Sequence, residues 1–235
     1  FDRPNIHLAL AVKDSPRAQS LNFAKARKGQ SGIVYCGTRA KTESLAKALN
    51  ENGQPAMAYH GGMDRDVRRD AERRFQQEDE LIVVATVAFG MGIDKPDIRW
   101  VAHADLPKSV ESYYQEIGRA GRDGAPAETL TLFGPDDIRF RRTQIDESPS
   151  PVERRAADHA RLNALLGIAE AQVCRRQNLL SYFGEDPEPC GTCDLCDSPP
   201  DLFDGTEAVR KALSAVLRCD EGFGAGHLID VLMGK

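Results

Sequence analysis

The chain has 235 residues, which is enough for one full hydrophobic core and a smaller second unit. Its formal net charge is −5; residues 1–145 hold 22 basic and 20 acidic side chains, so the acidity belongs to residues 146–235, which hold 9 and 16. This balance argues against a uniformly basic nucleic-acid-binding domain, although a basic stripe is still allowed. No apolar run approaches the ~20 residues of a membrane span.

Six cysteines spread over a chain of this size do not form the pattern of a secreted disulfide scaffold, so we expect a reducing, cytoplasmic compartment. The chain starts with Phe1 and has no signal-peptide pattern. We therefore expect a piece of a longer protein.

From about residue 30, short apolar segments alternate with helical segments. We expect strands at 33–36, 56–59, 81–86, 100–104 and 129–133, and helices at 39–50, 64–75 and 109–122. Thr38 is the expected N-cap of the first of these helices. The alternation predicts an α/β fold with a parallel sheet covered on both faces. Ligands of such sheets bind at the carboxyl ends of the strands, where Thr38, His60 and Thr86 stand.

The segment 115–124, with the sequence QEIGRAGRDG, carries the strongest local signal. On a helix, Gln115, Arg119 and Arg122 share one face, and two guanidinium groups aimed together make a phosphate clamp. Gly118 and Gly121 each cost about 1 kcal/mol in a helix, which predicts close approach of a nucleotide or a facing domain. Taken alone, the segment fits a glycine-rich turn with solvated arginines equally well.

The character of the sequence changes near residue 148. Ser150, followed by Pro151 and Glu153, predicts a capping box for a helix that extends to about residue 172. Further helices are expected at 175–183 and 206–219, and another begins at 227.

Four cysteines stand out by their spacing, namely Cys174, Cys190, Cys193 and Cys196. Four thiolates close a tetrahedral shell around Zn²⁺ and leave no position for water, so the sequence predicts a structural zinc site. An iron–sulfur cluster or a set of unrelated free thiols is the alternative.

Several further motifs occur in the same chain as this cysteine spacing. They are 33–36 followed by Arg39, and the segments 59–63, 85–96, 105–109, 113–124, 174–177 and 182–185. Together they resemble the RecQ family of superfamily 2 DNA helicases over essentially the whole chain. The resemblance implies a second RecA-like lobe at 1–147, a zinc-binding module at 148–200 and the start of a winged-helix domain at 201–235.

The resemblance also implies roles for individual residues. Arg122 resembles the arginine finger that reaches the γ-phosphate of ATP, and Arg119 its partner. Three other residues resemble positions on the nucleotide side: Gln115, Gly92 and Asp94. Five resemble positions that hold the phosphates of a DNA strand: Thr38, Arg39, His60, Gly61 and Thr86. Taken singly, these five also fit ordinary caps, helix starts and turns.

The resemblance implies ATP-dependent, 3′-to-5′ unwinding of DNA at a junction of single strand and duplex, in repair or recombination near the bacterial nucleoid. The sequence contains neither a P-loop nor an Asp-Glu-x-His box, so we expect an upstream lobe to bind ATP and Mg²⁺ and this piece to be inactive alone. An RNA helicase is one alternative, although DEAD-box enzymes usually carry His-Arg-x-Gly-Arg and lack the cysteines. A zinc-stabilised scaffold that binds DNA or protein without catalysis is the other.

Overall fold

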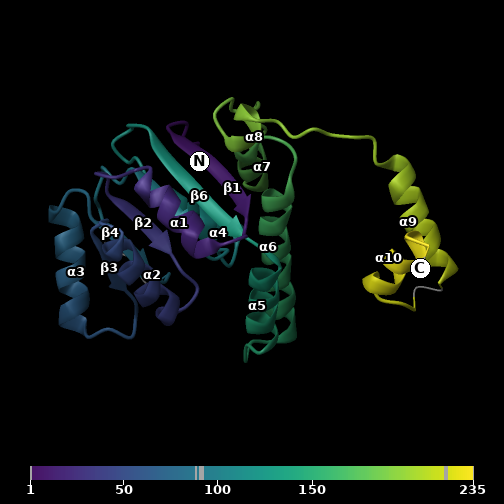
Figure 1. Ribbon diagram of the computed structural model, residues 1–235, viewed down its shortest axis with the longest axis horizontal. Coiled ribbons are helices and arrows are strands. Elements are labelled where there is room, and N and C mark those ends of the chain that lie inside the picture. Colours follow the sequence, from purple (N-terminus) through teal and green to yellow (C-terminus); the bar gives the residue numbers. More distant parts are fainter. Residues whose placement is uncertain (1, 88, 90–92, 220–221, 235) are drawn as a thin grey trace. The chain divides into compact units, whose positions relative to one another are not determined.

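The computed structural model describes residues 2–87, 89, 93–219 and 222–234, and the chain divides into two units, 1–199 and 200–235 (Figure 1). The strands of unit 1 are β1 Ile6–Val12, β2 Gly32–Tyr35, β3 Ala56–Tyr59, β4 Ile82–Ala85, β5 Trp100–His103 and β6 Ala127–Phe133. Its helices are α1 Pro16–Lys25, α2 Arg39–Glu51, α3 Arg65–Gln77, α4 Val110–Ile117, α5 Pro135–Asp146, α6 Val152–Glu170, α7 Arg175–Tyr182 and α8 Asp194–Asp197. Unit 2 contains α9 Thr206–Arg218 and α10 Ala225–Leu232.

The six strands form one parallel sheet in the order β1-β6-β5-β2-β4-β3. All five expected strands are present, and the predicted α/β class is confirmed. Because every strand runs in the same direction, the segments that follow β2, β3, β4 and β5 meet at one edge of the sheet.

The two faces of the sheet are covered by different helices, as alternation along the strands requires. In β2, Ile33 and Tyr35 pack in a large core with α3, α4, α6 and α7, while Val34 packs in a smaller core with α1 and α2. Trp100 of β5 is fully buried in the smaller core, where its ring lies against Phe23. The continuous Ile–Val content of the central strands reflects burial on both faces.

Four elements of unit 1 lay outside our predictions: β1, α1, α5 and α8. β1 pairs only with β6 and is an edge strand, with the burial pattern of a half-exposed strand. Its inward positions are Ile6, Leu8 and Leu10, which alternate with histidine and alanine as a half-buried strand requires.

The helix expected at 109–122 ends at Ile117. Ser109 caps its start by accepting a hydrogen bond from the backbone N–H of Ser112. Gly118 is the C-cap, and residues 118–123 form turns that lead to β6. Arg119 and Arg122 are therefore presented by a turn, and the helical face predicted for Gln115, Arg119 and Arg122 was wrong.

The capping box predicted at Ser150 was also wrong. The N-cap of α6 is Pro151, and the hydroxyl of Ser150 contacts that of Ser148. Helix α6 nevertheless spans most of the predicted range, and it contributes Leu162, Leu165 and Leu166 to the large core.

Candidate functional site

The turn that joins α4 to β6, residues 118–125, presents the two arginines of the QEIGRAGRDG segment; we call it the arginine turn. The Nη1 of Arg122 lies 2.9 Å from Oδ1 of Asp94 and donates to the carbonyl oxygen of Ile93 at 3.4 Å. Asp94 is 85% exposed, so water screens this ion pair. Exposed pairs contribute at most about 1 kcal/mol, so only a small free energy holds Arg122 to Asp94.

The positive charge of Arg119 acts on the buried hydroxyl of Tyr35. Burial raises the pKa of Tyr35, and the positive charge of Arg119 opposes that rise. The ring of Tyr35 stacks on His103 with centroids 5.3 Å apart, and His103 bridges Oγ1 of Thr131 at 3.0 Å and Oε2 of Glu116 at 2.9 Å. A buried polar network thus lies under the arginine turn.

The glycines of the turn make room for other groups of this chain. Gly121 has a φ of +57°, and a Cβ there would lie 2.5 Å from Nδ2 of Asn5 and 2.8 Å from the carbonyl oxygen of Ala125. A Cβ on Gly118 would lie 3.0 Å from the carbonyl oxygen of Tyr114. The close approach predicted for Gly121 is therefore real, but the approaching group is a side chain of the same chain.

Gln115 is exposed and lines a groove of about 570 Å³ between α4, α5 and α6, together with Lys108, Arg141 and Arg161. The structure therefore groups Gln115 with these cations and Arg122 with Asp94. Gly92, the remaining residue predicted on the nucleotide side, lies outside the described residues.

The five predicted DNA-contacting residues follow three neighbouring strands and meet at the carboxyl edge of the sheet. Thr38 and Arg39 follow β2, His60 and Gly61 follow β3, and Thr86 follows β4. The hydroxyl of Thr38 caps α2 by accepting from the backbone N–H of Lys41 at 3.3 Å, as predicted.

Arg39 and Gly62 lie against each other at this edge. A Cβ on Gly62 would lie 2.8 Å from Nη1 of Arg39, so the glycine makes room for the guanidinium. Arg39 is exposed, and within the described part of the chain no carboxylate pairs with it. His60 is buried and contacts Oε1 of Glu43 at 3.0 Å. Gly61 faces open space.

A cluster of charges around the buried Asp105, at the same edge, was missed by the sequence analysis. Asp105 accepts from Nζ of Lys13 at 2.7 Å, Nζ of Lys41 at 2.6 Å and the backbone N–H of Gly37 at 2.7 Å. Lys13 also contacts Asp137 at 2.6 Å. Burial alone would raise the pKa of Asp105, but these donors lower it to about 2. The signal was available, because Asp105 begins one of the motifs quoted above.

The four predicted metal-ligating cysteines converge in one place. All four sulfur atoms lie within 4.8 Å of one another, and four of the six pairs are separated by 3.4, 3.5, 3.9 and 4.0 Å. Zn–S bonds of about 2.3 Å place the sulfurs of a tetrahedron about 3.8 Å apart. The donor set and its spacing therefore fit Zn²⁺.

Backbone amides point at these sulfurs. Burial would raise the pKa of Cys174, but hydrogen bonds from the N–H groups of Cys190 and Gln177 lower it to about 7. Such bonds favour the thiolate, which is the form that binds a metal. Cys193 is fully buried, and burial raises its pKa to about 12 in the absence of a metal charge.

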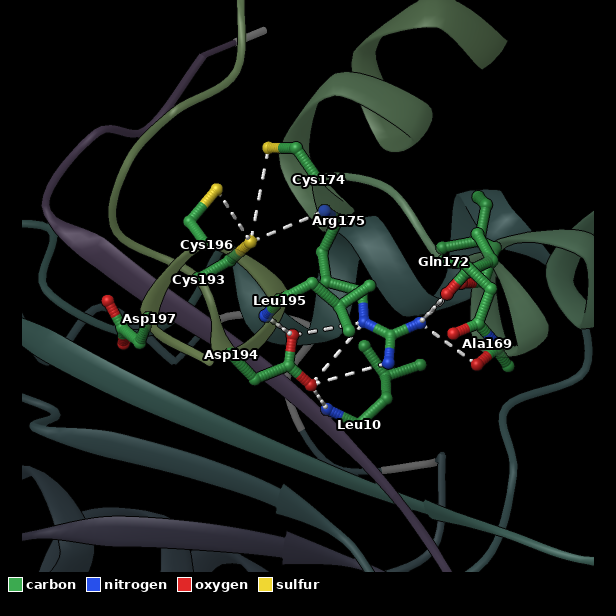
Figure 2. Close-up of polar contacts among 12 residues, drawn as sticks. Leu10, Ala169, Gln172, Cys174, Arg175, Cys193, Asp194, Leu195, Cys196 and Asp197 are labelled. Atoms are coloured by element: carbon green, nitrogen blue, oxygen red, sulfur yellow. Dashed lines mark hydrogen bonds and ion pairs between the residues drawn. The ribbon is translucent and has the colours of Figure 1, made fainter. Parts of the chain in front are cut away.

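The four cysteines lie in the segment 174–197, which we call the cysteine module. Next to the cysteines, Arg175 connects this segment to the end of α6 (Figure 2). Its Nη1 donates to the carbonyl oxygens of Ile168 and Ala169, both at 2.9 Å, at the end of α6. Its Nε contacts Oδ1 of Asp194 at 3.0 Å, and Oδ2 of Asp194 accepts from the backbone N–H of Leu10 at 2.9 Å. The cysteine module is therefore bonded to the free edge of β1.

Family models match almost the whole chain in three consecutive segments. The helicase conserved C-terminal domain matches residues 16–124, the RecQ zinc-binding domain residues 135–197, and the RQC domain residues 199–235. Within the described residues, no helix is long and apolar enough to cross a membrane.

Curated relatives align over the full chain. It is 46% identical to the ATP-dependent DNA helicase RecQ of Haemophilus influenzae and 37% identical to that of Bacillus subtilis, with 100% of the chain aligned in each case. It spans only 38% and 40% of the lengths of these relatives.

Among solved structures, the Escherichia coli DEAD-box protein SrmB bound to RraA matches with a TM-score of 0.51 and 27% identity, over 57% of this chain and 81% of that one. The second domain of the DEAD-box helicase Mss116p, bound to an RNA duplex, matches with a TM-score of 0.52 and 18% identity over 66% of this chain and 67% of that one, which shows the fold alone.

Proposed function

Because this chain belongs to the RecQ family of helicases, we propose that it forms the second RecA-like lobe, the zinc-binding module and the start of the RQC domain of an ATP-dependent 3′-to-5′ DNA helicase. The boundaries proposed for these parts are 1–147, 148–200 and 201–235. In the whole protein, an additional lobe supplies the P-loop and the ligands of Mg²⁺. The enzyme acts on DNA in repair or recombination in the bacterial cytoplasm.

We assign Arg122 as the arginine finger and Arg119 as its partner. The observation that carries this assignment is the exposed ion pair of Arg122 with Asp94, on a turn whose backbone is held from several sides. The pair holds the guanidinium beside Asp94, and the negative charge of a γ-phosphate would compete with Asp94 for it. A finger of this kind stabilises the charge of the phosphoryl-transfer transition state and is worth about 10³–10⁵ in rate.

Arg39 and the backbone N–H groups near Gly61 and Thr86 are proposed to hold the phosphates of the translocating strand, with Thr38 and His60 beside them. Support comes from their common position at the carboxyl edge and from the lack of a carboxylate partner for Arg39 among the described residues. Closing and opening of the cleft between the lobes would move the strand along this edge once per ATP.

We propose that the four cysteines hold Zn²⁺ in a structural role. The metal closes a shell of four thiolates and leaves no open position, so it stabilises the fold of 135–197. The chain's own groups complete the site, since amide donors favour the thiolates and Arg175 holds Asp194 beside them.

The experiment is to replace Arg122 by Ala in the full-length protein and measure DNA-stimulated ATP turnover and DNA affinity. We expect kcat to fall by about 10³-fold or more, with DNA affinity largely retained. Arg69→Ala is the matched control, because Arg69 is an exposed arginine on α3 outside the site. Unchanged turnover in Arg122→Ala would favour the non-catalytic scaffold and end the enzyme claim for this residue.

A further inference from the structure

Arg3, ahead of β1, is hydrogen-bonded to the arginine turn, more than 100 residues away in the sequence. Its guanidinium donates to the carbonyl oxygens of Gly118 at 3.2 Å, Ala120 at 3.0 Å and Gly121 at 2.8 Å. Carbonyls at and beyond the end of a helix have no intrahelical partner, and a planar fork can satisfy several of them at once.

Asn5 is hydrogen-bonded to the next part of the same turn. Its Nδ2 donates to the carbonyl oxygens of Gly121 at 2.8 Å and Ala125 at 2.9 Å. The left-handed φ of Gly121 and its missing Cβ create the space that the Asn5 amide fills. The Asn5 side chain can occupy this position only because residue 121 is a glycine.

All five of these hydrogen bonds end on backbone carbonyls of the arginine turn. They therefore fix the path of the main chain on both sides of Arg119 and just before Arg122, whatever those two side chains contact. β1 does not need these bonds to stay in the sheet, because its seven residues pair with β6 and Leu10 is bonded to Asp194.

We propose that Arg3 and Asn5 are positioning residues for phosphoryl transfer, which hold the turn so that Arg119 and Arg122 reach the nucleotide in one orientation. This inference rests on the role proposed above for the two arginines. Neither residue is expected to touch ATP. Without them the turn gains freedom, and a displacement of about 1 Å in a catalytic group can cost up to about 10²-fold in rate.

The test uses the full-length protein and the variant Asn5→Ala, with Asn50→Ala as a matched control. Asn50 also donates two side-chain hydrogen bonds to backbone carbonyls, those of Ala46 at 2.9 Å and Ala56 at 2.7 Å, and its Oδ1 accepts from the N–H of Ala56 at 3.1 Å. It lies next to β3, at the opposite edge of the sheet from β1. Both variants lose two side-chain hydrogen bonds to backbone carbonyls, and Asn50→Ala loses one accepted bond more, but only Asn5→Ala loses its bonds at the arginine turn.

We expect Asn5→Ala to lower kcat for ATP by about 10- to 100-fold with little change in KM, and Asn50→Ala to leave kcat at the wild-type level. Arg3→Lys should recover part of the kcat lost in Arg3→Ala, because one ammonium can still reach one of the three carbonyls. Amide hydrogen exchange over 118–125 should be faster in Asn5→Ala than in the wild type.

The two proposals fail in different ways. If Arg122→Ala leaves turnover unchanged, the proposed function fails, whatever the exchange rates are. If Arg122→Ala lowers turnover but Asn5→Ala neither lowers kcat nor speeds exchange over 118–125, the positioning role is wrong. Equal losses of kcat in Asn5→Ala and Asn50→Ala would also overturn it, because they would indicate a general loss of folded protein.

Discussion

Replacing Asp105 by Asn should remove a pH-dependent contribution to the stability of the RecA-like lobe. In the folded chain Lys13, Lys41 and the N–H of Gly37 hold the pKa of Asp105 at about 2, against an ordinary value of 3.8. The folded state therefore favours the carboxylate more than the unfolded state does. The resulting stability is fully present above pH 3.8 and is lost as the pH falls through about 2.

The size of the effect follows from the two pKa values. At about 1.4 kcal/mol for each unit of pKa, the difference between 3.8 and about 2 is worth about 2 kcal/mol. Linkage predicts that about half of this contribution is lost between pH 7 and pH 3. Asp105→Asn keeps the shape of the side chain but cannot titrate, so its stability should lack this part of the pH dependence.

The assay is urea unfolding of the zinc-loaded protein at several pH values, followed by the fluorescence of Trp100. This residue is the chain's single tryptophan and is fully buried in the lobe. Protonation of the cysteines weakens zinc binding in both proteins, so the difference between wild type and variant isolates Asp105. Lys41→Met, which removes one of the two cations, should show an intermediate pH dependence. If wild type and Asp105→Asn lose stability in parallel from pH 7 to pH 3, the account of this cluster is wrong.

Two further predictions concern packing and the metal module. Arg175→Leu should weaken zinc binding by about 10- to 100-fold, because Asp194 and the end of α6 lose their shared partner. Competition with a chelating dye measures the affinity for zinc. Arg161→Leu, which removes an exposed ion pair with Asp158, is the control and should leave zinc binding unchanged. Gly32→Ala should lower the free energy of unfolding by about 1–3 kcal/mol or more, because a Cβ there would lie 2.0 Å from the ring of Trp100. The control is Gly167→Ala on α6, where a Cβ meets open space and no loss of stability is expected. Thermal melts of the two variants measure the difference.

The central strands β2 and β4 were predictable because burial on both faces requires continuous apolar runs, and 33–36 and 82–85 have them. β1 lies ahead of residue 30, where our strand predictions begin; it was missed although Ile6, Leu8 and Leu10 alternate with small or polar residues, which is the pattern of a half-buried strand. The cysteine cluster was predictable because three of its four members lie within seven residues. Its bonds to β1 join residues about 180 positions apart, and no local pattern records them.

The arginine turn shows where local patterns mislead. Glycines in a helix-like segment indicated a close approach, and the approach exists, but its partner is Asn5. Sequence spacing suggested a helical face for Arg119 and Arg122, whereas Gly118 ends the helix and the backbone then leaves its axis. The identity of the arginines could be predicted from the sequence, but their placement depends on the chain ahead of β1.

The cysteine module and the arginine turn are connected through β1. An edge strand exposes unpaired backbone groups that can pair with another chain. Here Asp194 accepts from the N–H of Leu10, and Arg176 donates to the carbonyl oxygen of Ile6, so the module covers that edge. The same strand directly follows Asn5, whose side chain is hydrogen-bonded to the arginine turn. If the turn positions the arginines as proposed, a metal that only stabilises the fold still contributes to catalysis, because it stabilises the strand from which the turn is held.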